Sequence, residues 1–103
     1  MFALTSADRS WFIGFCHRWK ISELALFGSA LRADFRPDSD LDILVTFTTD
    51  AEWGLLDHAA MQEELSLHFR RPVDLISRKA IERSANPIRR QQILRTAEVV
   101  YAA

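Results

Sequence analysis

The chain has little of what marks secreted, membrane-bound or strongly charged proteins. Its 103 residues include one cysteine, Cys16, so no disulfide can form within the chain and a reducing compartment is expected. No stretch approaches the roughly 20 apolar residues of a membrane span, and the N-terminus lacks the basic region and long apolar run of a signal peptide. These absences predict a cytoplasmic protein that has no membrane partner.

An excess of positive charge is also missing. Lysine and arginine together number 13, and aspartate and glutamate number 14, which gives a formal net charge of −1. A protein that binds duplex DNA by neutralising its phosphates needs a basic surface, so direct DNA binding is not expected. No repeat, low-complexity tract or linker divides the chain, and 49% of its residues are hydrophobic. We therefore expect residues 1–103 to form a single domain with one small core.

Apolar residues recur alternately at helical and at strand spacing, which indicates a single α/β or α+β domain. The order and direction of the strands do not follow from the pattern. Leu44, on the second face of the clearest strand, predicts that both faces of the sheet are partly covered. Strands are predicted at 21–27, 41–47 and 72–77, with 99–101 as a final strand or apolar tail. Helices are predicted after Thr5 or Ser6, over 29–33, from 53 or 55 to 69, over 78–84 and from Asn86-Pro87 onward. A loop is predicted at 35–39, which contains Pro37.

Several apolar side chains are expected to pack together. Trp11, Trp53 and the tail at 99–101 are expected to be core residues, although an exposed aromatic patch would instead mark a protein interface. The expected core-facing residues are Phe12, Phe15, Cys16 and Trp19 on the first helix, and Leu56, Ala60 and Leu67 on one side of the long helix with Met61, Leu65 and Phe69 nearby.

Three aspartates form the most informative pattern. Asp40 and Asp42 stand two residues apart at the start of a strand and so point to one face. Asp74 lies within an apolar run, and an adjacent strand about 4.8 Å away would bring it to the same place. Carboxylates are hard oxygen ligands suited to Mg²⁺. Two such ions about 4 Å apart can stabilise the entering and leaving oxygens of a phosphoryl transfer, and Asp74 could accept the proton of the attacking hydroxyl.

A Gly-Ser turn precedes the aspartates. Gly28 allows any φ and close backbone approach, and Ser29 stands where a helix would begin, so its hydroxyl and the free amides could hold a phosphate. These parts together predict phosphoryl or nucleotidyl transfer. The alternative is that Asp40 belongs to a solvated loop and that Asp42 and Asp74 face water on edge strands.

The runs Phe27–Arg32 and Pro37–Val45, with Val73-Asp74-Leu75, resemble the minimal nucleotidyltransferase (MNT) family of the DNA-polymerase-β superfamily. The likeness is greatest to antitoxins that are paired with ribonuclease toxins of the HEPN (higher eukaryotes and prokaryotes nucleotide-binding) type. It covers nearly the whole chain. One departure is Ala33, where family members often have Gly, which puts the turn geometry in question.

The resemblance implies a nucleotidyltransferase fold, with a small mixed sheet flanked by helices. It implies that Gly28 and Ser29 form the nucleotide-phosphate turn and that Asp40, Asp42 and Asp74 are catalytic metal ligands. The implied reaction is Mg²⁺-dependent AMPylation, in which AMP passes from ATP to a tyrosine of a HEPN toxin and neutralises it. The implied partners are therefore ATP and the toxin, in a hetero-oligomer.

Other polar residues have weaker signals. Arg32 could contact the nucleotide, and Arg36 could do so or remain a solvated surface residue. Cys16 is expected to be a core residue rather than a nucleophile. The three histidines share no metal-ligand spacing and are expected to be surface or structural: His17, His58 and His68. The arginines near the C-terminus are expected to line a solvated helix face, the alternative being an RNA or an acidic partner: Arg83, Arg89, Arg90 and Arg95.

Three hypotheses follow about function. The first is the AMP-transferring antitoxin. The second is a catalytically idle binding module that masks its partner sterically. The third keeps the enzyme but uses an RNA end or a small antibiotic as acceptor. The weak net charge disfavours RNA, and the short chain leaves no second domain to hold a small acceptor, so a protein acceptor that brings its own positioning surface is favoured.

Overall fold

The structure is a computed structural model that describes residues 2–36 and 38–103, so the predicted loop position of Pro37 lies outside the described residues. The predicted elements are confirmed within one or two residues at most ends, and the uncertain tail is a strand. The elements are α1 (Ser6–Arg18), β1 (Ile21–Phe27), the 3₁₀ helix η1 (Gly28–Leu31), β2 (Leu41–Phe47), α2 (Leu55–Phe69), β3 (Val73–Ser77), α3 (Arg78–Glu82), α4 (Pro87–Thr96) and β4 (Glu98–Ala102).

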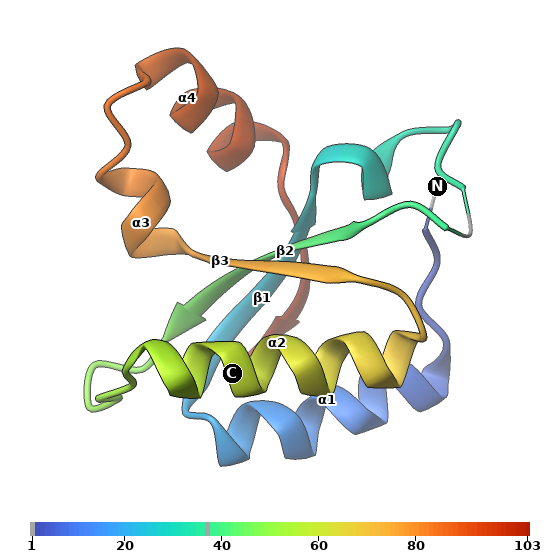
Figure 1. Ribbon diagram of the computed structural model, residues 1–103, viewed down its shortest axis with the longest axis vertical. Coiled ribbons are helices and arrows are strands. Elements are labelled where there is room, and N and C mark those ends of the chain that lie inside the picture. The colour runs from blue at the N-terminus through green and yellow to red at the C-terminus, as the bar shows by residue number, and fades with distance from the viewer. Residues whose placement is uncertain (1, 37) are drawn as a thin grey trace.

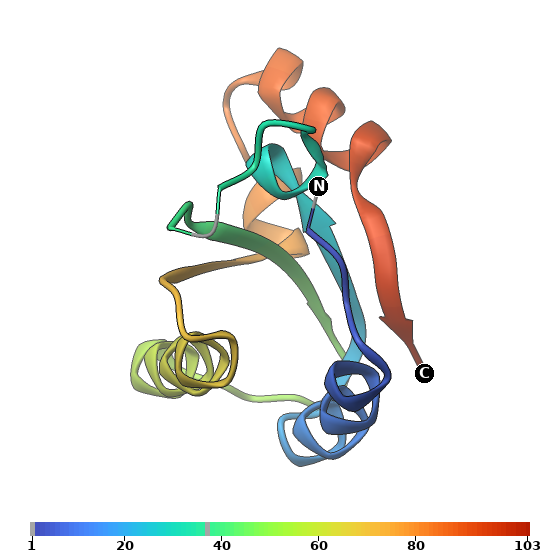
Figure 2. The same ribbon diagram turned by 90° about the vertical axis from the view of Figure 1, so that its right-hand side faces the viewer.

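Four strands form one mixed sheet in the order β3-β2-β1-β4, as Figure 1 shows. β1 pairs antiparallel with both β2 and β4, whereas β2 and β3 are parallel because α2 carries the chain back between them. α1 and α2 pack on one side of the sheet, and α3 and α4 lie toward the other (Figures 1 and 2). The fold is α+β, with a small mixed sheet flanked by helices, as the sequence predicted.

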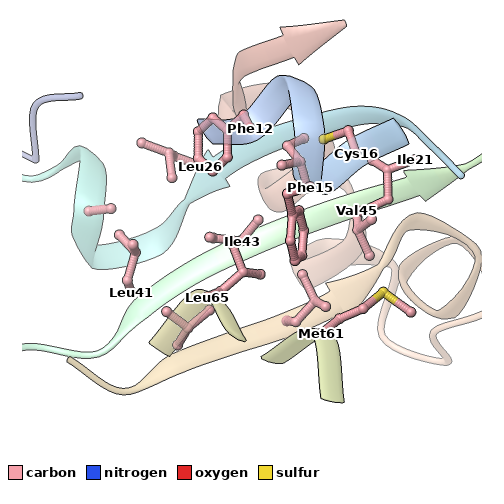
Figure 3. Packing of buried hydrophobic residues seen from close by; sticks show 14 residues of the cluster. Phe12, Phe15, Cys16, Ile21, Leu26, Leu41, Ile43, Val45, Met61 and Leu65 are labelled. Atoms are coloured by element: carbon pink, nitrogen blue, oxygen red, sulfur yellow. The ribbon is translucent and has the colours of Figure 1, made fainter. Parts of the chain in front are cut away.

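The main core lies between the sheet and the helices α1 and α2. Helices α1 and α2 and strand β2 contribute completely buried side chains to this core. Figure 3 shows how they pack together: Phe12, Leu41, Ile43, Val45, Met61 and Leu65. Trp11 and Trp53 pack partly buried against this cluster, as predicted. The prediction that Leu56 and Leu67 face the core is wrong, because 85% and 71% of these side chains are exposed.

Polar contacts with β3 determine which side of α2 faces the sheet. The side-chain oxygen of Gln62 accepts the backbone N–H of Leu75 at 2.9 Å, and His58 Nε2 donates to the carbonyl of Leu75 at 2.6 Å. Ser66 Oγ accepts the N–H of Val73 at 3.0 Å. These three side chains recur every four residues, so one stripe of α2 covers the free edge of β3. The apolar residues on the far side of α2 are therefore left in solvent.

The second face of the sheet has a smaller core. Leu44 of β2 is buried there, as predicted from its position, together with Ala25 and Phe27 of β1. Ile81 of α3 and Ile93 of α4 cover these side chains. No helix in residues 2–36 and 38–103 is long and apolar enough to cross a membrane.

Candidate active site

Asp42 and Asp74 lie side by side at one end of the sheet. They are direct partners in the parallel register of β2 and β3, and Phe27 of β1 is the partner of Asp42 on its other side. Paired residues of neighbouring strands have their side chains on the same face, and the strands are about 4.8 Å apart. Asp40 lies just before β2, two residues from Asp42. All three predicted carboxylates therefore belong to one end of the sheet, on the face that α3 and α4 partly cover.

The Gly-Ser turn is closely fitted to this acidic end. Gly28 has φ +66°, in the left-handed region that other residues adopt at a cost. A Cβ atom at this position would lie 2.5 Å from Oδ2 of Asp42, so the backbone approaches the carboxylate as closely as only glycine allows. Ser29 Oγ donates to the carbonyl of Asp40 at 3.3 Å, which ties the turn to the start of β2.

The charges around Asp42 show that the carboxylates act on one another. Burial raises the pKa of Asp42 above its ordinary value, and the negative charges of Asp74 and Asp40 raise it further. The backbone N–H of Ser29 and the positive charge of Arg89 partly oppose this rise. A bound cation would relieve the repulsion among the carboxylates, so the electrostatics favour one at this place.

The carboxylates fit a hard divalent cation by chemistry and by location. Asp40, Asp42 and Asp74 supply only oxygen donors, the type that Mg²⁺ prefers. Within residues 2–36 and 38–103, however, no three acidic, histidine or cysteine side chains are already gathered closely enough to bind one ion together. The absence of a Cβ at Gly28 lets the carboxylate of Asp42 lie directly against the backbone of the turn. The assignment of these residues as metal ligands is accordingly a prediction.

Arg32 does not lie with the carboxylates in this structure. Its guanidinium pairs with Asp34, with Nε 3.3 Å from Oδ1, and its side chain is 68% exposed. A contact between Arg32 and a nucleotide would therefore require it to exchange that partner. Ala33 lies in a turn, and among the described residues the only non-glycine positions with positive φ are Lys20 and Arg70. The backbone at Ala33 thus has no need of glycine, which removes the question raised by this departure.

Two arginines beside the site were not identified as site residues from the sequence. Arg89 was expected to line a solvated helix face, yet its charge acts on Asp42. The guanidinium carbon of Arg71 lies 5.2 Å from the ring centre of Phe2 and 4.8 Å from that of Phe35, and its Nη1 donates to the carbonyl of Arg36 at 3.3 Å. Arg71 thereby anchors the segment that leads toward Asp40.

The remaining residues that were weighed have structural roles. His68 Nε2 lies 2.8 Å from Oδ1 of Asp8 and joins α2 to α1, and His58 contacts β3 as described above. Cys16 is buried, and burial raises the pKa of its thiol to about 12, so the prediction that it is a core residue is confirmed.

A cavity of about 810 Å³ lies at the opposite end of β2 and β3, away from the carboxylates, beside Trp53 and Lys79.

Known proteins are similar to this chain in sequence. The family model described as a nucleotidyltransferase domain matches residues 13–99. A protein of Methanocaldococcus jannaschii, described as a candidate protein adenylyltransferase, is 33% identical over 64 residues. That match covers 62% of this chain and 64% of the relative, so the chain spans less than two thirds of the relative's length.

Solved structures share the fold over nearly the whole chain. A structure described as a candidate minimal nucleotidyltransferase is 34% identical, with a TM-score of 0.66, and covers 92% of this chain and 89% of its own. A toxin–antitoxin structure with AMP-PNP has a TM-score of 0.70 at 19% identity, covering 93% and 74% of the two chains. A complex of a tri-AMPylated HEPN toxin with its MNT antitoxin from Shewanella oneidensis has a TM-score of 0.63 at 19% identity, covering 97% and 74%.

Proposed function

Because the chain belongs to the family of nucleotidyltransferase domains, we propose that it transfers AMP from ATP to a tyrosine hydroxyl of a HEPN ribonuclease toxin and so neutralises the toxin. The observation that carries this proposal is the register pair of Asp42 and Asp74 beside the tightly fitted turn at Gly28 and Ser29. An acidic end of a sheet next to an open phosphate turn is the arrangement that nucleotidyl transfer needs.

Each residue has a defined part in the proposed reaction. The tyrosine oxygen forms a bond to the α-phosphorus of ATP, the bond from that phosphorus to the oxygen bridging to the β-phosphate breaks, and pyrophosphate leaves with the electron pair. Gly28 and Ser29 form the turn along which the phosphates lie. Asp40 and Asp42, with Asp74, would hold Mg²⁺, two ions in the full complement, which neutralises the phosphate charge. Asp74 accepts the tyrosine proton, and it is the exposed member of the register pair, open to an approaching partner.

A protein acceptor is supported by the structural neighbours of this domain. The described residues have a radius of gyration of 13.2 Å and are built on a single four-stranded sheet. Positioning contributes much of the rate in such reactions, and a protein acceptor supplies its own docking surface. Structures with this fold include MNT antitoxins in complex with HEPN toxins, one of them AMPylated. A HEPN protein encoded beside this chain is therefore the proposed acceptor.

The proposal is tested by incubating the chain with ATP labelled in the α-phosphate, Mg²⁺ and the HEPN protein encoded beside it. Label should appear on the toxin with the native chain and should fall at least a hundredfold with Asp42→Asn, since an essential charge at the reacting phosphate is lost. Asp50→Asn is the matched control, because Asp50 is an exposed carboxylate paired with Lys20 in the turn after β2. A folded native chain that binds ATP but labels no partner would contradict the proposal.

Steric masking is the second candidate, and exposed apolar side chains favour it. Leu55 and Leu56 at the start of α2 are 84% and 85% exposed, and Ile88 is 78% exposed, which suits a protein interface. The doubly substituted chain Asp40→Asn/Asp42→Asn separates the two functions. If this variant neutralises the toxin fully at equal molar amounts without any label transfer, steric masking is the function. If neutralisation is lost while the variant still binds the toxin, AMP transfer is the function.

A further inference from the structure

α4 places Arg89 over the acidic end of the sheet. Ile93 of α4 is buried against Phe27 and Leu44 in the smaller core. Arg89 lies four residues before Ile93 and so projects from the same side of the helix, one turn closer to its start. Phe27 is the register partner of Asp42, and Leu44 follows Asp42 by two residues on the same face. Arg89 therefore lies on the side of α4 that faces the end of β2 at which Asp42 stands.

The start of α4 is held firmly in this position. Asn86 Oδ1 accepts the backbone N–H groups of Ile88 and of Arg89, each at 3.2 Å. The guanidinium of Arg90 donates to the carbonyls of Glu82 and Ser84, at 3.5 and 3.4 Å, and so braces the connection from α3. The guanidinium of Arg89 itself is exposed, and no carboxylate within residues 2–36 and 38–103 lies within 4.0 Å of it. Arg89 thus extends from an anchored helix, and its guanidinium is available to bind an anion.

Arg89 lies on the phosphate side of the site rather than the acceptor side. Ile93 packs against β1, and the turn at Gly28 follows directly from the end of β1. Asp74 lies on β3, on the other side of Asp42. In both views α4 and η1 lie toward the same end of the molecule (Figures 1 and 2). An anion bound between Arg89 and the turn would therefore extend away from Asp74, where the acceptor hydroxyl would enter.

We propose that Arg89 binds the β- and γ-phosphates of the nucleotide and stabilises the pyrophosphate that leaves. This inference rests on the proposed function, since it assigns a further residue to the same site. A guanidinium presents two parallel N–H groups that match a phosphate, and the group stays charged at all working pH values. The negative charge on the leaving pyrophosphate increases as its bond to the α-phosphorus breaks, so Arg89 contributes to binding and to the rate.

The test compares nucleotide binding by the native chain, Arg89→Gln, Arg89→Lys and Arg95→Gln, by calorimetry with Mg²⁺. The ligands are AMP and an ATP analogue whose α–β bridge cannot be cleaved. Arg95 is the matched control, because it is an exposed arginine of the same helix, six residues further on, away from the side that carries Arg89 and Ile93. Arg89→Gln should lower the affinity for the ATP analogue by about tenfold to a hundredfold, the range for the loss of a charged hydrogen bond. AMP binding should be unchanged, and Arg89→Lys should lie between.

Three results bear on the inference separately from the proposed function. If the native chain binds the ATP analogue and Arg89→Gln binds it equally well, the inference is overturned and the proposed function stands. If Arg89→Gln lowers the affinities for AMP and for the ATP analogue by the same factor, Arg89 does not act on the β- and γ-phosphates, and the inference is also overturned. If the folded native chain binds no nucleotide, the proposed function itself fails before any variant is compared.

Discussion

Gly28 meets two requirements that no other residue can meet together. Its φ of +66° lies in the left-handed region, and a Cβ at this position would lie 2.5 Å from a carboxylate oxygen of Asp42. An added methyl group must therefore push Asp42 aside or move the turn. Both responses disturb the place where the phosphates and the metal are proposed to bind.

We expect Gly28→Ala to lower the free energy of unfolding by about 1–3 kcal/mol, the cost of a strained backbone position, and to lower AMP transfer at least tenfold. The measurements are urea unfolding and the label-transfer assay. Gly14→Ala is the control: it lies within α1 with no atom within 4 Å of the added Cβ, so it should stabilise the fold by about 0.5–1 kcal/mol. Equal activity of Gly28→Ala and the native chain would contradict the fitted-turn account.

Asp8 joins the start of α1 to α2. Its carboxylate accepts the N–H of Thr5 at 2.9 Å while Thr5 Oγ1 accepts the N–H of Asp8 at 3.1 Å, and its other oxygen lies 2.8 Å from His68 Nε2. Burial by itself would raise the pKa of Asp8, but the contacts with Thr5 and His68 outweigh it, and the pKa lies below the ordinary value of 3.8. The charged form is therefore the one that the fold stabilises.

This lowered pKa fixes the sign of a pH dependence. The stabilisation by Asp8 is complete above the ordinary pKa of 3.8 and is lost as the pH falls through the lowered value in the folded protein. Asp8→Asn should cost about 1 kcal/mol at neutral pH, the usual worth of a capping box, and progressively less in acid. Unfolding by urea at several pH values measures the difference. A difference that stays the same at pH values well below 3.8 would show that the charge of Asp8 is not the cause.

The contact between α2 and β3 determines where Asp74 lies. Gln62 and His58 of α2 bind the two backbone groups of Leu75, the residue after Asp74. Removing such a contact leaves a partly buried backbone group without its partner, which costs about 1–3 kcal/mol. The free edge of β3, the strand that carries Asp74, is thus bound by side chains of a helix rather than by another strand.

Gln62→Ala should therefore destabilise the fold by about 1–3 kcal/mol and should lower AMP transfer more than it lowers ATP binding, because Asp74 loses its support. Glu63→Ala, one position further on at an exposed site, should change stability by less than about 0.5 kcal/mol. Denaturant unfolding gives the stability, and calorimetry with the transfer assay gives the activity. If both variants behave alike, the polar stripe of α2 has no special role in holding β3.

The elements were predictable where local signals agree. Thr5 and Asn86 are N-caps with standard geometry, and Pro87 starts α4, so these helix boundaries follow from short-range chemistry. The exposed side of α2 was not predictable, because apolar Leu56 and Leu67 give a plausible stripe. Its true orientation depends on hydrogen bonds to β3, which lies several residues away in sequence and whose free edge cannot be seen in the apolar pattern.

For the molecule as a whole, the candidate site divides into a local part and a distant part. The Gly-Ser turn and the first two aspartates lie within 15 consecutive positions, and their spacing alone predicts an acidic phosphate site. Asp74 was predictable because an acidic residue interrupts an apolar strand. Arg89 was not, because only the packing of α4 against β1 brings it to the same end of the sheet as Asp42, and strand order and helix packing are tertiary features that no periodicity contains.

The central claim is that Asp40, Asp42 and Asp74 gather around metal ions beside the turn at Gly28 and Ser29. A crystal structure of the chain with Mn²⁺ and a non-cleavable ATP analogue tests it most directly, since Mn²⁺ can be located by its anomalous scattering. The account predicts Mn²⁺ bonded to oxygens of all three carboxylates, with the triphosphate along the turn. Metal and nucleotide bound elsewhere on the molecule, with Asp74 turned away from Asp42, would contradict it.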